Sequence, residues 1–194
     1  MDVIEAMHAR RSIRAYRPER VDRALIEDLI WAAAQAPTPP ASGETPWSFC
    51  VIEGVDRLAV YGARAKQYAR DHQPEGRPRT WTESPDFKVF WDAPALVLIC
   101  GRGGIREAPF DCCRAGQNLM LAAHARGLGS CWVGAPLSWL NSPDVAEELG
   151  LPAGFDPMVA IILGYPAQTP VGNPRPRPFI NWSSSHTTLS QGSR

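Results

Sequence analysis

The chain has 194 residues, of which 44% are hydrophobic, so it is long enough to form one domain with a buried core. Twenty basic residues balance twenty acidic ones, which excludes a general electrostatic attraction for nucleic acid or an anionic membrane. No apolar run approaches the ~20 residues of a membrane-spanning helix, and the first residues lack the apolar stretch of a signal peptide. We therefore expect a cytoplasmic protein.

The first half of the chain alternates helical and strand patterns. Apolar residues at helical spacing predict helices over residues 2–11, 21–36 and 56–71. The loop at 36–46 is rich in proline, which cannot continue a helix. The run WSFCVIE at 47–53 predicts a strand directly after this loop.

The second half begins with an irregular stretch at 72–90, which we expect to be a mobile cover or an edge loop. Continuous apolar runs then predict buried strands at 95–100 and 158–163, with a short strand at 130–133 between them. A helix is predicted over residues 111–126. Another helix is predicted to begin at the Ser142-Pro143 cap and to end at Gly150.

The end of the chain favours one last strand at 179–182 and a flexible tail over 183–194. Residues 1–182 are expected to form a single domain. Its four or five strands and about five helices indicate an α+β or α/β fold. Because the extended C-terminal segment has no obvious partner in its own chain, we expect its exchange with a second copy.

Cysteines and histidines give little sign of a disulfide or metal centre. The five cysteines form no Cys-x-x-Cys pair, and the four histidines are widely scattered without ligand spacing. A Cys113 nucleophile acting with His124 is the remaining catalytic alternative, although no orienting motif surrounds either residue.

A basic cluster, Arg10-Arg11-Ser12-Ile13-Arg14, follows the first predicted helix. If the helical turn continues, Arg10 and Arg14 lie on one side, with the Ser12 hydroxyl between them. Guanidinium groups present paired donors that suit a phosphate. Such a cluster is also typical of a solvated surface, so the motif alone leaves both interpretations open.

Further motifs follow this cluster in a fixed order. They are Pro46-Trp47 before a strand, Ala93-Pro94 before another, GQNLMLAAHARGLGSCWVG at 116–134, LGLP at 149–152, LGYP at 163–166, and Arg175 with Arg177. The ordered set, over residues 1–180, resembles the nitroreductase family of FMN-dependent oxidoreductases. The resemblance implies an α+β, three-layer fold, in which helices flank a mostly antiparallel central sheet. It also implies a homodimer that exchanges the C-terminal segment and binds FMN at its interface.

The resemblance assigns site residues one by one. The N-terminal cluster would bind the FMN phosphate and ribityl chain, and the C-terminal arginine pair would close on the phosphate. A backbone N–H of the stretch 132–135 would donate to flavin N5. The implied FMN-binding residues are Arg10, Arg11, Ser12, Arg14, Thr45, Lys88, Trp132, Val133, Gly134, Ala135, Arg175 and Arg177.

Taken alone, some of these segments have simpler explanations. The glycine after the strand at 130–133 is typical of a turn, and the arginine pair is typical of a solvated tail. Five aromatic residues could form walls around the flavin, but such residues are equally typical of core packing. These aromatic residues are Trp47, Trp81, Phe87, Phe90 and Trp91.

The loop at 36–47 departs from the family pattern. An Asn and a Gln usually precede the Pro-Trp pair, whereas here Ser42 or Gly43 replaces the Asn and Thr45 replaces the Gln. In the family this loop comes from the partner subunit and touches flavin and substrate. The departure therefore bears on substrate preference more than on FMN binding.

The implied activity is transfer of hydride from NAD(P)H through flavin N5 to an electron-poor acceptor, such as a nitroaromatic, a quinone or an enone. The expected mechanism is ping-pong and needs no nucleophilic side chain, since the cofactor supplies the chemistry. The chain has no glycine-rich Rossmann fingerprint, so contact with NAD(P)H would be transient. The alternatives are a specialised flavin dehydrogenase or dehalogenase of a biosynthetic substrate, a flavin-binding protein without turnover, and a basic adaptor without cofactor.

Overall fold

The centre of the fold is a four-stranded antiparallel sheet, in a computed structural model that describes residues 1–39, 45–72, 80–172 and 175–183. The strand order is β1-β2-β4-β3. The strands are β1 (Trp47–Glu53), β2 (Ala95–Arg102), β3 (Gly129–Trp132) and β4 (Phe155–Gly164). In β2 every residue but the last is buried, as its continuous apolar run predicts. The structure thus confirms the four strands within the domain.

One face of the sheet is covered by α2 (Arg23–Ala33) and α5 (Ala108–Ala125). In α2 the Asp22 carboxylate accepts a hydrogen bond of 3.0 Å from the Ala24 N–H and so caps the first turn. Both helices bury one apolar face against the sheet, which confirms the helical patterns of the sequence.

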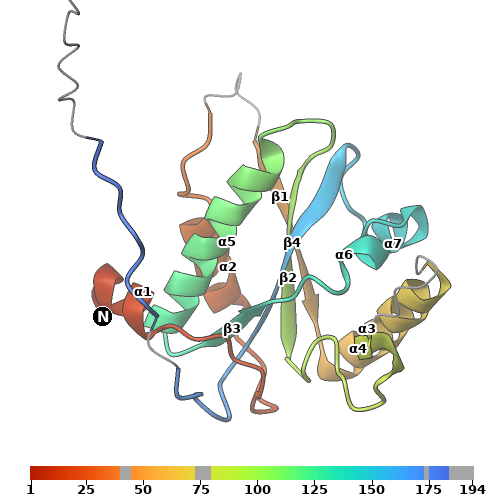
Figure 1. The fold of residues 1–194 in the computed structure, drawn as a ribbon. Helices are drawn as coiled ribbons and strands as arrows, with labels where there is room; N and C mark the ends of the chain where they lie inside the picture. Colours follow the sequence, from red (N-terminus) through yellow and green to blue (C-terminus); the bar gives the residue numbers. More distant parts are fainter. Residues whose placement is uncertain (40–44, 73–79, 173–174, 184–194) are drawn as a thin grey trace, which may run out of the picture.

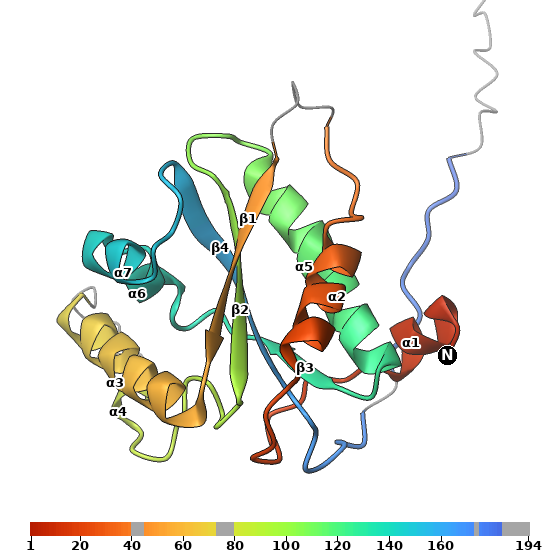
Figure 2. The same cartoon turned by 180° about the vertical axis from the view of Figure 1, so that it is seen from behind.

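The opposite face is covered by α3 (Val55–Asp71), α4 (Thr80–Glu83), α6 (Leu137–Leu140) and α7 (Pro143–Glu148). Figures 1 and 2 show the sheet between these two helical layers. The three-layer α+β architecture is therefore confirmed. Among the described residues the structure has seven helices, more than expected, because α4 and α6 are single turns without a periodic apolar face.

The N-terminal helix α1 (Val3–Ala9) is shorter than predicted. After Ala9 the chain becomes extended, and the Ile13 N–H donates to the Ser130 carbonyl at 3.0 Å. Ile13 is buried against Gly129, where an added Cβ would lie 2.8 Å from Ile13. The expectation of a continuing helical turn is wrong, because the free edge of β3 pairs with this segment and needs an extended backbone.

The C-terminal segment leaves the domain beside α1 and extends away from it (Figures 1 and 2). Residues 179–182 form no strand in the structure, so this prediction is wrong for the single chain. The side chains of Phe179 and Trp182 are 93% and 83% exposed there. The predicted flexible tail lies, except for its first residue, outside the described residues. None of the described helices combines the length and apolarity that crossing a membrane requires.

Candidate functional site

A groove of about 240 Å³ opens where the chain leaves β3, and we call it the front groove. Three segments that are distant in the sequence meet there: the N-terminal cluster, the loop before β2, and the stretch after Ser130. Its lining residues are Arg14, Phe87, Val89, Trp91, Cys131, Trp132, Val133, Gly134 and Ala135. The structure therefore brings together five of the predicted site residues, Arg14 and the stretch 132–135.

The backbone that follows β3 supplies two of the residues that line this groove, Gly134 and Ala135. The Val133 N–H donates to the Ala160 carbonyl at 2.9 Å and continues the sheet. For the N–H groups of Gly134 and Ala135, the described part of the chain provides no acceptor. An added Cβ on Gly134 would meet no atom within 4 Å. Backbone donors beside open space are available to a ligand that carries acceptor atoms.

Trp91 forms one wall of the front groove at a conformational cost. Trp91 and Asp92 both have a φ of 54°, in the left-handed region. Each such residue costs on the order of 1–3 kcal/mol. The turn is held by a 3.0 Å hydrogen bond from the Ala93 N–H to the Phe90 carbonyl and by the Lys88–Asp92 ion pair. The Arg14 guanidinium carbon lies 5.8 Å from the centre of the Trp91 ring, within the range of a cation–π interaction.

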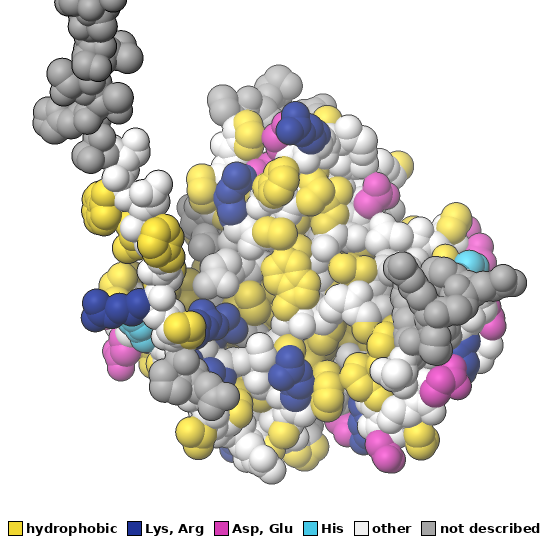
Figure 3. All heavy atoms as spheres, viewed as in Figure 1, with side chains coloured by type: hydrophobic (Ala, Val, Ile, Leu, Met, Phe, Trp, Pro, Cys, Tyr) yellow, Lys and Arg dark blue, Asp and Glu magenta, His cyan; other side chains and the backbone are white. Residues whose placement is uncertain are grey.

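Arg10 is subject to a second positive charge, that of Arg175. Burial, followed by the charge of Arg175, lowers the pKa of Arg10, and the charge of Arg11 lowers it further. Arginine stays protonated in proteins. Within the described ranges, no carboxylate pairs with Arg10, Arg14 or Arg175. Figure 3 shows basic side chains on both sides of the C-terminal segment where it passes α1. This uncompensated charge fits an anionic ligand.

Arg11 has a different role from its neighbours. Its guanidinium donates to the carbonyls of His8 and Arg10, at 2.7 and 2.9 Å, and so satisfies the end of α1. The C-terminal segment passes directly over it, because an added Cβ on Gly172 would lie 1.6 Å from Arg11 Nε. Arg11 thus supports the path that carries Arg175 back toward the N-terminal cluster.

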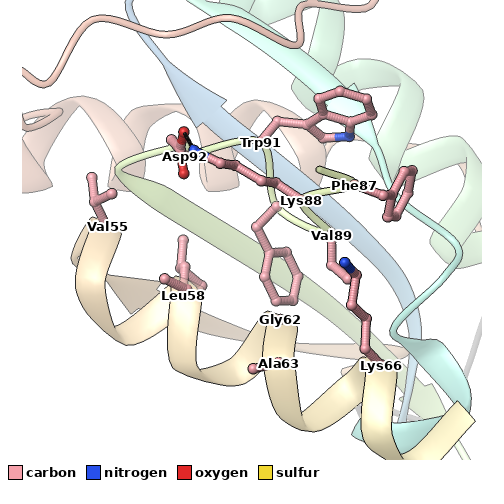
Figure 4. A pocket seen from close by; sticks show the side chains of 12 residues that line it. Val55, Leu58, Gly62, Ala63, Lys66, Phe87, Lys88, Val89, Trp91 and Asp92 are labelled. Carbon is pink, nitrogen blue, oxygen red and sulfur yellow. Dashed lines mark hydrogen bonds and ion pairs between the residues drawn. The ribbon is translucent and has the colours of Figure 1, made fainter. Parts of the chain in front are cut away.

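Other predicted residues lie apart from the front groove. Lys88 lines a second groove of about 280 Å³, between α3 and residues 87–92, which we call the α3 groove (Figure 4). Thr45 precedes Trp47, which pairs with Gly101 at the far end of β2. Arg177 is exposed, and the described residues give it no contact. Ser12 is half-buried and pairs with β3 through its backbone.

The aromatic candidates divide between the groove and the core. Phe87 and Trp91 line the front groove, whereas Trp47 and Phe90 are buried in the core. Val89 is a lining residue that the sequence analysis missed. The alternation of Phe87, Val89 and Trp91, with the period of an extended chain, was the signal that could have identified it.

Comparisons with known proteins agree with this geometry. The model of the family described as the nitroreductase family matches residues 7–165. A protein of Methanothermobacter thermautotrophicus, provisionally named NADH dehydrogenase/NAD(P)H nitroreductase, is 31% identical over 88% of this chain and 80% of its own length. The 5,6-dimethylbenzimidazole synthase of Rhodospirillum rubrum is 27% identical over 82% of this chain and 79% of its own length.

A solved structure supports the same assignment. The nitroreductase of Bacteroides fragilis NCTC 9343, solved with bound FMN, is 25% identical, with a TM-score of 0.79 over 92% of this chain and 95% of that chain. The fold, the ordered motifs and the extent of these matches together show that this chain belongs to the nitroreductase family.

Proposed function

We propose that this chain binds FMN in the front groove and reduces an electron-poor acceptor with electrons from NAD(P)H. The observation that carries this proposal is a groove lined by Arg14, Gly134 and Ala135, in which the described residues offer no acceptor to the two backbone N–H groups and no carboxylate to the guanidinium. Both ends of the cofactor have fitting partners: a dianionic phosphate matches the arginines, and the flavin ring matches the donors and the aromatic wall.

At the phosphate end, we assign charge neutralisation to Arg10 and Arg175, with Arg177 and the Ser12 hydroxyl as further partners. Burying a phosphate without counter-charges is costly, and two guanidiniums placed together repel each other until an anion arrives. The charge of Arg175 contributes to the lowered pKa of Arg10, after burial, and supports such a pair. We expect phosphate binding to relieve this repulsion.

At the ring end, we assign ring binding to the N–H groups of Gly134 and Ala135 and to the wall formed by Trp91. When bound, FMN supplies the group that accepts and then donates hydride, so no side chain need act as a nucleophile. Arg14 faces this end and would stabilise negative charge that develops there. Donor and acceptor would use the site in turn, which predicts ping-pong kinetics.

We also propose a homodimer that completes the site. Val3 and Met7 on α1 are 57% and 48% exposed, and the C-terminal segment carries the still more exposed Phe179 and Trp182. Apolar surface of this kind marks an interaction site. A second copy would cover it and would bring its own Thr45 toward the front groove. Light scattering of the full chain at several concentrations would test this, and a monomer throughout would contradict it.

The decisive test is an absorption spectrum of the purified protein, before and after anaerobic addition of NADPH and then NADH. We expect flavin bands that bleach when either nucleotide is added. Bands that persist would exclude NAD(P)H as the donor and favour a flavin protein without this turnover. A colourless protein that free FMN cannot reconstitute would contradict the proposal entirely.

The similarity to 5,6-dimethylbenzimidazole synthase favours a second candidate, a specialised flavin enzyme acting on a biosynthetic substrate. The altered loop before β1 is consistent with it, although residues 40–44 of that loop lie outside the described residues. The candidates separate in turnover assays. The flavin bands of a specialised enzyme would bleach with NAD(P)H, but the enzyme would reduce nitroaromatics, quinones and enones poorly.

A further inference from the structure

The two lysines of this chain share one groove. Of its twenty basic residues only Lys66 and Lys88 are lysines, and the other eighteen are arginines. Both lysines line the α3 groove, with apolar residues forming most of its remaining wall. An ammonium is a compact charge with three donors, which a single anionic group can approach from several directions.

The two ammonium groups differ in their partners. Lys88 forms an ion pair with Asp92, so its charge is neutralised. Lys66 is half-buried, and its Nζ donates to the Ser84 carbonyl at 2.8 Å. No carboxylate among the described residues pairs with Lys66. Figure 4 shows Lys88 extending toward Asp92, whereas Lys66 rises from α3 toward Val89 and Phe87. Lys66 therefore keeps its charge and two of its three N–H donors for a ligand.

Lys66 lies next to the wall that the two grooves share. Phe87, Val89 and Trp91 line both the α3 groove and the front groove. Lys66 Nζ lies 5.8 Å from the centre of the Phe87 ring, and Phe87 packs edge-on against Trp91 with ring centres 5.4 Å apart. The positive charge of Lys66 therefore lies beside Phe87, one of the residues at which the α3 groove meets the front groove.

We propose that Lys66 binds the anionic group of a planar substrate whose ring lies against Phe87, where the α3 groove meets the front groove. This inference rests on the proposed function and adds a substrate class: flat, conjugated molecules that carry a carboxylate or a phosphate. The anionic group has two sources, an acceptor with its own carboxylate or the phosphates of the NAD(P)H donor. Lys66 then selects substrates by charge and takes no part in the chemistry.

Binding to the oxidised flavoprotein without electron donor tests the charge preference directly. Isothermal titration with 4-nitrobenzoate and with its neutral analogue 4-nitrobenzamide gives two dissociation constants. In Lys66→Met the benzoate affinity should fall about tenfold relative to the benzamide affinity, the usual loss for a hydrogen bond to a charged group. Lys66→Arg should restore most of the preference, and Lys66→Glu should enlarge the loss. Arg106→Met, which removes an exposed charge from the loop between β2 and α5, should leave the ratio unchanged.

Steady-state kinetics separates the two sources of the anion. With 4-nitrobenzamide as acceptor, the KM values for NADH and NADPH are compared in the wild type and in Lys66→Met. A loss confined to nitrobenzoate assigns Lys66 to an acceptor carboxylate, and a rise confined to the nucleotide KM assigns it to a donor phosphate. If Lys66→Met leaves the nitrobenzoate preference and both nucleotide KM values unchanged, the proposal is wrong.

Failure of the proposed function would look different. A wild-type protein without flavin bands would contradict the reductase proposal, while the nitrobenzoate titration would still report whether Lys66 binds an anion. Circular dichroism spectra identical to the wild type show that each variant is folded.

Discussion

Two groups of arginines in this molecule differ in their counter-charges. On α3, Arg64 pairs with Glu148 of α7 at 2.7 Å, and Arg57 donates to the Tyr61 hydroxyl at 3.0 Å, which in turn donates to Glu148 at 2.7 Å. Around the front groove, Arg10, Arg14 and Arg175 have no carboxylate partner among the described residues. The same residue type joins two helices in the first group and leaves its charge available to a ligand in the second.

This difference shows why a basic cluster in a sequence is ambiguous. Arginines become structural when the fold brings a carboxylate to them, and the carboxylate can be far away in the sequence, as Glu148 is from Arg64. Where the described residues supply no carboxylate and a further cation acts on the arginine, as Arg175 does on Arg10, the charge stays available, and we propose that such arginines bind an anion. The comparison would be wrong if a substitution in the α3 group lowered FMN affinity, or if a substitution in the front-groove group left it unchanged.

The largest effect is expected for the double substitution Arg10→Ala with Arg175→Ala. Each guanidinium contributes charge-assisted hydrogen bonds, so FMN affinity should fall about 10- to 100-fold per arginine. Fluorescence titration of FMN against apoprotein measures this loss. Arg64→Ala is the control for each of the two single substitutions, since it removes one guanidinium but should leave FMN affinity close to the wild type. Equal losses in Arg64→Ala and in either single variant would contradict the division into two groups.

A smaller, purely structural effect is expected for Tyr61→Phe. The hydroxyl that accepts from Arg57 and donates to Glu148 is lost, although the ring stays packed against Trp139. We expect the free energy of unfolding to fall by about 1 kcal/mol. Urea denaturation measures it, and the FMN dissociation constant should be unchanged. A loss of FMN affinity would show that the hydrogen bonds between α3 and α7 also affect the structure of the front groove.

A lesser effect again is expected for Arg177→Ala. Arg175 and Arg177 are both exposed, but only Arg175 is among the charges that lower the pKa of Arg10, and Arg177 has no hydrogen bond or ion pair with a described residue. Exposed charge interactions contribute at most about 1 kcal/mol, so FMN affinity should fall at most about fivefold. The same fluorescence titration applies. A loss as large as that of Arg175→Ala would show that both arginines close on the phosphate equally.

The smallest effect is a pH dependence at Glu148. The Tyr61 hydroxyl, followed by Arg64, lowers the pKa of this carboxyl below its usual 4.5. The folded state therefore binds this proton less readily than the unfolded chain. The stabilisation is fully present above pH 4.5 and is lost as the pH falls through the lowered pKa. In urea denaturation, the stability difference between wild type and Glu148→Gln should be greatest at neutral pH and shrink below pH 4.5. If the stability difference between the two proteins did not change with pH, the charge of the Glu148 carboxylate would contribute nothing to the contact between α3 and α7.

The sequence by itself determined most of the core. The strand at 47–53 has the predicted bounds, and the apolar faces of α2 and α5 lie on the sheet as their spacing indicates. These features can be predicted because each helix or strand that buries one face needs apolar residues at the spacing of its own backbone. The ordered motifs likewise identified the family, because they recur at fixed places along the chain. The sequence also marked the stretch after β3 and the N-terminal arginines as one site.

Only the tertiary structure decided how that site is built. The backbone of Arg10 to Arg14 is extended because β3 offers it a free edge, which no local pattern of the segment reveals. Trp91 adopts a left-handed backbone that its residue type disfavours, and the turn after Phe90 maintains it. Lys66 reaches Phe87 across the space between α3 and the loop before β2. Each of these features depends on contacts between residues distant in sequence, so neither propensity nor periodicity could have determined them.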